Sequence, residues 1–226
     1  MTVGRLIAPE SDDEILDLEP EALAFKPVMT GDAFVGLRVP DEPDPMDVMV
    51  AGHPCTIRRG ATLVERVPCV RLVEHQWVPY ERWPDYDQNH FPIPAVADIG
   101  QGRCAALWEW TAVPRDELLR GRRRVTLQDQ GIYIFLQRLI HSLSRFAPPV
   151  TALKEASAHV LAEAELEYSW VMELLDGDPD STHLTQLVSE FDAFMTAENR
   201  RNTLRTDRKR VAAEVDAEIR RRREAT

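Results

Sequence analysis

Histidine and cysteine residues in the first half of the chain are the side chains whose types and spacing could bind a metal. His53 and Cys55 are separated by one proline, and Cys69 and His75 follow them. Imidazole nitrogen and thiolate sulfur are donors that suit tetrahedral zinc. Neither pair has the two-to-four-residue gap of zinc knuckles and ribbons, and Cys104 is a further donor in reserve. The alternative is that the cysteines are buried structural residues, as free cysteines commonly are.

Other motifs of catalysis are absent from the sequence. There is no Gly-x-Ser-x-Gly elbow, and the glycines at 100 and 102 lack the further glycine or lysine of a phosphate-binding loop. Glu163 and Glu167 are one helical turn apart, and without a second set of ligands they predict a solvated acidic face rather than a di-iron site. We therefore assign no catalytic residue, and zinc is the one cofactor considered.

Arginine clusters supply the clearest binding signal. The candidate residues stand before the central helix and in the last helix: Arg122, Arg123, Arg124, Arg205, Arg208 and Arg210. A basic helical stripe is the electrostatic footprint of binding to a phosphate backbone. Arginine also pairs with carboxylates through two hydrogen bonds, so acidic segments of the same chain could neutralise the stripe. The alternative is a terminal helix that is simply solvated.

Aromatic residues gather between residues 77 and 110, where Trp83 and Tyr86 lie in a long segment rich in proline and aspartate. Residues this large usually fill the core of a small domain. If part of the group is exposed, it would form a protein-binding hot spot or a surface for stacking bases. We take Trp83 and Tyr86 as candidate anchors for a partner.

One helix, expected from Thr126 to Phe146, organises the chain around these residues. Its apolar residues recur at spacings of three and four, and Thr126 is a suitable N-cap. Further helices are expected at 151–176, from Ser181 or Thr182 onward, and beyond Ala197. The last one is polar nearly all round, and its sparse apolar residues allow a short coiled coil.

Short β-like runs precede the central helix. They are 48–50, 55–58, 62–67, 69–73 and 105–113, with Pro68 marking either a bulged edge or the gap between two strands. The predicted fold class is therefore α+β, with a small β-rich N-terminal half and a helical C-terminal half that ends in a long basic helix. The expected divisions are an acidic segment with a Pro-rich connector (1–46), a β-rich domain (47–115), a helical domain (116–196) and the basic helix (197–226).

Charge alternates in blocks along the chain. Residues 1–50 hold twelve acidic residues against three basic ones, and residues 147–195 hold ten against one, whereas residues 196–226 hold six against ten. Such blocks indicate electrostatic complementarity within the chain or with a partner. No apolar run is long enough to span a membrane, the first residues do not resemble a signal peptide, and the cysteines are few and scattered. We expect a cytoplasmic protein.

These features favour a non-enzymatic accessory or regulatory factor that binds a protein partner and, as a further candidate, nucleic acid. The excess of arginine over lysine is typical of a GC-rich genome, so we expect a bacterial or phage origin. The alternatives are a structural subunit of a larger, phage-like assembly, including a homo-oligomer, and a zinc-binding protein or enzyme centred on His53, Cys55, Cys69 and His75.

Overall fold

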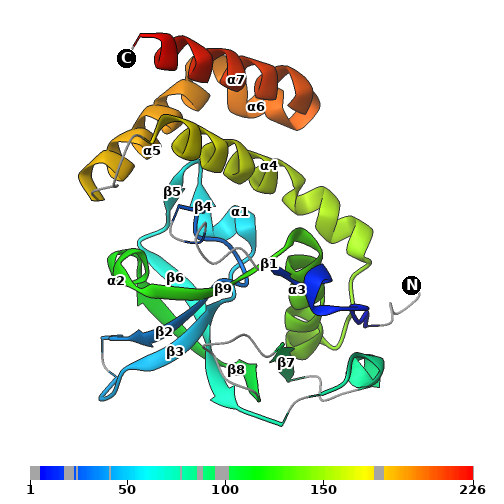
Figure 1. Cartoon of the computed structure of the whole chain (residues 1–226). Helices are drawn as coiled ribbons and strands as arrows, with labels where there is room; N and C mark the ends of the chain where they lie inside the picture. The colour runs from blue at the N-terminus through cyan, green and yellow to red at the C-terminus, as the bar shows by residue number, and fades with distance from the viewer. Residues whose placement is uncertain are drawn as a thin grey trace.

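The computed structural model describes residues 6–17, 23, 25–40, 42–76, 78–85, 89–94, 102–175 and 181–225. The predicted α+β class is confirmed, because an antiparallel sheet is built from the first 127 residues and helices dominate the rest (Figure 1). In the described part of the chain no helix is long and apolar enough to cross a bilayer.

The sheet has seven strands in the order β1-β9-β2-β3-β6-β8-β7, and β4 and β5 form a separate hairpin. The strands are β1 (Leu16–Asp17), β2 (Ala33–Leu37), β3 (Met46–Val50), β4 (Arg58–Arg59), β5 (Thr62–Leu63), β6 (Arg66–Glu74), β7 (His90–Ile93), β8 (Arg103–Pro114) and β9 (Arg122–Leu127). The α-helices are α1 (Pro54–Ile57), α2 (Arg115–Arg120), α3 (Asp129–Ser144), α4 (Val150–Leu174), α5 (Ser181–Thr196), α6 (Arg200–Thr206) and α7 (Arg208–Glu224). The 3₁₀ helices are η1 (Asp12–Glu14), η2 (Tyr80–Asp85) and η3 (Ala197–Asn199).

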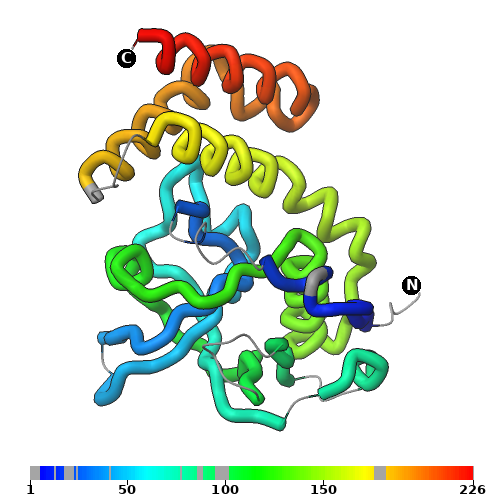
Figure 2. The backbone as a smooth tube through the Cα atoms, in the orientation of Figure 1, coloured from blue at the N-terminus to red at the C-terminus, as the bar shows by residue number. Residues whose placement is uncertain are grey.

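The sheet extends beyond the predicted β-rich segment at both ends. Strands β1 and β2 come from the acidic N-terminal segment, and β9 contains the arginine cluster that was expected to precede a helix. Figure 2 shows the N-terminal part of the chain lying beside β9. These strands have only two to six residues, so they carry too little alternation to be predicted.

Two local predictions were corrected by the structure. Residues 55–58 were expected as a strand, but Pro54–Ile57 form helix α1, because His53 accepts a hydrogen bond from the Cys55 amide and a proline occupies the first turn. Pro68 does not divide β6. Its carbonyl accepts a hydrogen bond from the Ala51 amide, so the backbone nitrogen of Pro68 points to the same side. Strand β3 has already ended there at Val50, so β6 loses no ladder hydrogen bond to β3 at the proline.

Helix α3 packs on one face of the sheet and forms the main core with residues such as Phe91, Leu107 and Phe135. It begins three residues later than predicted. Thr126 is not its N-cap, because the Thr126 backbone pairs with Asp17 in the sheet. All residues of the helix from Gly131 to Leu139 are buried, and they include Arg138, whose guanidinium lies over the Trp83 ring of the same core.

Helices α4 to α7 pack together at the end of the sheet that carries the β4–β5 hairpin, and the first half of α4 also packs on α3, where Leu153 and Leu161 join the main core (Figure 1). Trp170 of α4 packs its ring against Phe191 and Phe194 of α5 with centroids 5.8 and 5.3 Å away. A separate apolar core of the helical layer therefore holds these helices together.

The basic C-terminal segment belongs to this layer rather than extending from it. It is two helices instead of one, since the chain breaks at Asp207, whose carboxylate accepts from the Arg210 amide and caps α7. Its sparse apolar residues, which allowed a coiled coil, are buried against α4 and α5 with 0–5% of their surface exposed: Leu204, Val211, Val215 and Ile219.

A buried ion pair joins the sheet to the helical layer. Arg58 of β4 pairs with Glu167 of α4, and only 3% and 5% of the two side chains are exposed. Beside it, the Ala61 amide donates to Asp192 at 3.1 Å, and Arg201 bonds both Asp192 and Glu163 at 2.6 and 2.7 Å. The expectation that Glu163 and Glu167 form a solvated acidic face is wrong, because both bind arginines inside the structure.

Docking of the C-terminal helices predicts a stability effect at Leu204. Leu204→Ala should lower the free energy of unfolding by about 2–5 kcal/mol, because it leaves a cavity between α6 and the rest of the layer. Lys209→Ala, at an exposed position of α7, should change it by less than about 0.5 kcal/mol. Urea titration measures both values. Equal stability of the Leu204→Ala variant and the original chain would show that the segment is not docked in solution.

The Arg58–Glu167 pair predicts a pH effect on stability. Burial raises the pKa of Glu167 to about 7 despite the opposing charge of Arg58. Because the folded pKa lies above the unfolded value, this carboxyl stabilises the fold fully below about pH 4.5, and that contribution is lost as the pH rises through 7. Relative to Glu167→Gln, the original chain should therefore lose up to about 3 kcal/mol between pH 4.5 and 7.5.

Urea titrations at both pH values test this difference, with Glu173→Gln as a control because Glu173 pairs with Arg223 on the surface. If the original chain and Glu167→Gln change stability in parallel with pH, then Glu167 does not titrate in this range.

Candidate metal centre

Three neighbouring strands bring His75, His90 and Cys104 to one face of the sheet. Residues opposite one another in paired strands share a face, and so do alternate residues along a strand. Cys104 of β8 lies opposite Val73 of β6 on one side and Pro92 of β7 on the other. His75 is two residues after Val73, and His90 is two residues before Pro92. Both imidazoles are therefore diagonal neighbours of the cysteine.

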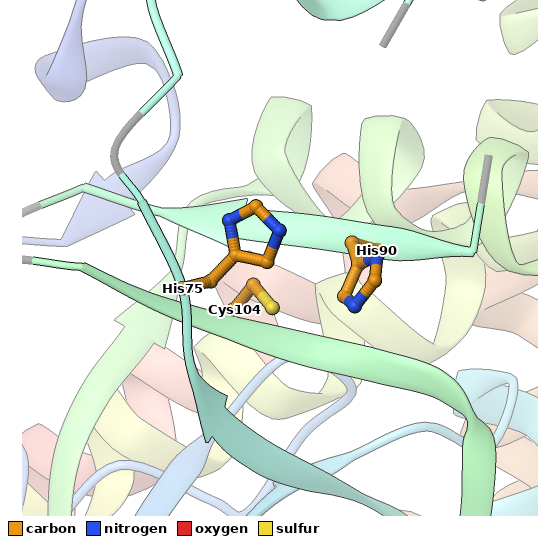
Figure 3. A group of neighbouring side chains, drawn as sticks. All are labelled: His75, His90 and Cys104. Carbon is orange, nitrogen blue, oxygen red and sulfur yellow. The ribbon is translucent and has the colours of Figure 1, made fainter. Parts of the chain in front are cut away.

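The three side chains meet closely enough to share one ion. Their ligand atoms all lie within 4.8 Å of one another, and the two imidazole centroids are 4.7 Å apart with the rings tilted by 51°. Figure 3 shows the His75 and His90 rings next to the Cys104 side chain. Ligand atoms around tetrahedral zinc are about 3.5 Å apart, given metal–ligand bonds of about 2.0–2.3 Å. Small side-chain rotations would bring this set to that geometry.

Backbone contacts orient His75. Its Nδ1 lies 2.8 Å from the carbonyl oxygen of Gln76, so Nδ1 carries the proton that is donated and Nε2 carries the lone pair that a metal needs. The His75 amide donates to the Gly102 carbonyl at 2.5 Å, which continues the β6–β8 ladder past its last strand residue. Gly102 has a φ of +90°, and a Cβ there would lie 2.3 Å from the His75 carbonyl oxygen. Only glycine suits this close approach.

Burial differs among the three ligands. Cys104 is fully buried, whereas His75 and His90 are half-buried. The Trp108 and His90 rings lie at a right angle to one another with centroids 4.5 Å apart, and 50% of Trp108 is exposed. The residue opposite His90 in β8 is Ala106, whose small side chain leaves space beside the imidazole. The cysteine sulfur is therefore the deepest ligand atom of the site, and the two imidazoles lie closer to solvent.

Sequence reasoning found His75 and held Cys104 in reserve, but it missed His90. His90 falls in the segment that was treated as a loop, and its signal is weak because β7 has only four residues. The other predicted ligands lie elsewhere in the described structure. Cys69 is six residues from His75 along the same strand, about 20 Å away. It lies in the second apolar core of the sheet, and burial raises the pKa of its thiol.

His53 and Cys55 pack against helix α4 rather than joining a metal centre. The Nε2 atom of His53 lies 3.3 Å from the Ser157 hydroxyl, and the Cys55 sulfur lies 3.3 Å from the Ala156 carbonyl and 3.9 Å from His159 Nε2. Burial raises the pKa of the Cys55 thiol and lowers that of His53. The predicted four-residue set is thus not assembled in the described part of the chain.

Carboxylates of the same chain bind three of the six arginines predicted to contact a partner. Arg123 donates to Asp32 at 2.9 Å and is nearly buried, and its neighbours Arg122 and Arg124 lie in the same sheet strand. In the helical layer, the contacts of the predicted residues are Arg208 with Glu165, Arg210 with Glu214 at 2.9 Å, and Arg205 with His159 at 3.4 Å. The acidic and basic blocks of the sequence therefore neutralise one another within the chain.

Trp83 is not available as an anchor, because it is 1% exposed in the main core and its indole nitrogen donates to the Val78 carbonyl. Tyr86 lies outside the described residues. Among the tryptophans that the structure describes, the exposed ones are instead Trp108 and Trp110 of β8, with 50% and 42% of their surface exposed.

Comparison of the chain with models of known protein families and with curated protein sequences finds no match. The class of the protein is therefore defined by its fold and its site: an α+β protein that carries a candidate metal centre of two histidines and one cysteine.

Nucleic-acid binding stays a prediction, and the ion pairs of the last helices give it a sharp test. Because Arg208 and Arg223 bind Glu165 and Glu173, we expect a short DNA duplex to bind no more tightly than about 10⁻⁴ M at 0.15 M salt. The double variant Glu165→Gln, Glu173→Gln should bind more tightly, because it removes both acidic partners. Fluorescence anisotropy across a salt series measures this. Micromolar binding by the unmodified chain that weakens steeply with salt would contradict the expectation.

Proposed function

We propose that this chain is a zinc-binding protein whose metal is held by His75, His90 and Cys104. The observation that carries the proposal is the approach of three ligand atoms, from three adjacent strands, to within 4.8 Å of one another. The proposal keeps the zinc hypothesis drawn from the sequence but moves it to a different set of residues.

The donor types suit the metal. Zinc binds thiolate sulfur and neutral imidazole nitrogen in tetrahedral sites. A buried thiolate is costly on its own, because burying a charge without a partner loses its hydration. Cys104 is fully buried, so a cation between it and the two imidazoles would supply the charge that makes its thiolate form stable there.

The supporting structure suits a fixed site. All three ligands are placed by a hydrogen-bonded sheet rather than by long loops, and the Gln76 carbonyl holds one imidazole in the required tautomer. Such second contacts set the orientation of metal ligands and commonly change metal affinity by about 10- to 100-fold when they are lost. Here the contact is made by the backbone, so a side-chain substitution cannot remove it.

The role of an accessory or regulatory factor that binds a protein stays a prediction. Its electrostatic basis is reduced by the internal ion pairs, and its remaining support is the exposure of Trp108 and Trp110. A zinc centre is compatible with that role, and the metal proposal itself assigns no reaction to the chain.

Zinc binding predicts one equivalent of metal per chain after dialysis. Cys104→Ser should lower the metal content to less than a tenth, because the sulfur is the one anionic ligand of the set. Cys55→Ser, which changes an exposed cysteine at another site, should keep the full content. Elemental analysis of the purified variants for zinc and copper measures both. Since two histidines and a cysteine also suit copper, an intense blue absorption with copper and no retained zinc would contradict the choice of metal. Equal metal content in both variants would contradict the site.

A further inference from the structure

Resting on the proposed zinc site, we propose that the bound metal has a coordination position open to solvent and takes there a small anionic ligand that carries a planar apolar group. Zinc sites with a structural role are closed by four protein ligands, whereas sites that bind external molecules have three and an open position. Within the described ranges, three ligand-type side chains meet at this site.

The open side is indicated by the faces of the sheet. Residues alternate between the two faces, and the neighbours of the ligands on the other face, including Leu72, Phe91 and Ala105, belong to the core beneath helix α3. The ligands therefore point away from that core. Since His75 and His90 are half-buried and Cys104 is fully buried, an ion held by all three has the sulfur beneath it and its remaining position toward solvent.

A bulge in β8 places the Trp108 side chain beside this position. Val70 pairs with Trp110 and the next residue, Arg71, pairs with Ala106, so three residues of β8 have no opposite residue in β6. Trp108 is the middle one. Its indole contacts the His90 ring at a right angle and is half exposed, so a large aromatic side chain lies beside the proposed metal position and is accessible to a ligand.

A cation lies on the same face. Arg71 and His90 are the two residues opposite Ala106, one in each neighbouring strand. The Arg71 side chain is 51% exposed, and its contact with Glu109 is long, at 4.0 Å. A positive metal and a guanidinium beside it favour an anionic ligand, and Trp108 favours one with a planar apolar group.

Cobalt substitution tests the open position. In the cobalt(II) form of the full chain, azide and acetohydroxamate should both change the visible absorption bands, because an external donor enters the coordination shell. Benzohydroxamate should bind roughly threefold to tenfold more tightly than acetohydroxamate, because its ring contacts Trp108.

Substitutions of two tryptophans test the contact between the ligand and Trp108. Trp108→Ala should abolish the preference for benzohydroxamate while it keeps acetohydroxamate binding, and Trp110→Ala, a matched change at the neighbouring exposed tryptophan, should keep the preference. Trp108→Leu serves as a second variant with a retained apolar volume. The absorption bands of bound cobalt before any ligand is added show that each variant retains the site.

The outcomes separate the two proposals. Absence of stoichiometric cobalt binding would overturn the zinc site itself. Stoichiometric cobalt whose spectrum responds to none of the three probes would overturn the open position and leave metal binding intact. A benzohydroxamate preference that survives both Trp108 substitutions would overturn the assigned ligand class.

Discussion

The buried pair of Arg58 and Glu167 is the interaction that fixes the helical layer on the sheet. Removal of one partner would leave the other charge buried without a counter-charge, which costs about 3–5 kcal/mol, so the two layers pack with these side chains in register. The hairpin that carries Arg58 fits closely, because a Cβ at Gly60 would lie 2.3 Å from the Arg201 guanidinium. Arg201 in turn binds Asp192 of α5, so the tip of one short hairpin contacts helices from three parts of the sequence.

The same kind of pairing explains the alternating charge of the sequence. The acidic block of α4 and α5 lies against the basic block of α6 and α7, and Arg222 binds Glu190 while also stacking on Trp170. The sequence predicted complementarity correctly, but block charges carry no information on whether the opposite charge is in the same chain. The four apolar residues of the last two helices did not hold that information either, because their spacing suits both a partner and the chain's own core. In the structure these residues pack into the chain's own core, an outcome that local periodicity cannot predict.

The grouping of His75, His90 and Cys104 was not predicted from the sequence for a similar reason. Fold class and the four main helical regions follow from periodicity, which is a local property, whereas metal ligands meet through strand register, which is not. His75 and Cys104 are 29 positions apart, and His90 lies between them in a strand of four residues. The neighbouring pair of His53 and Cys55 was favoured because it is close in sequence. Its short segment formed a capped helical turn instead, which directs both side chains toward α4.

Strand β6 connects the hairpin of the Arg58–Glu167 pair to the candidate metal centre. It begins next to the hairpin that is held by Glu167 and ends at Glu74, directly before His75, with nine residues that span about 30 Å. Interactions separated by more than about 10 Å without shared partners contribute almost independently to stability. The Arg58–Glu167 contact at one end of β6 therefore helps to hold the two layers together, and the candidate metal centre at the other end depends on the register of β6, β8 and β7. Substitutions in the helical layer can then change stability while the geometry of the His75, His90 and Cys104 site stays the same.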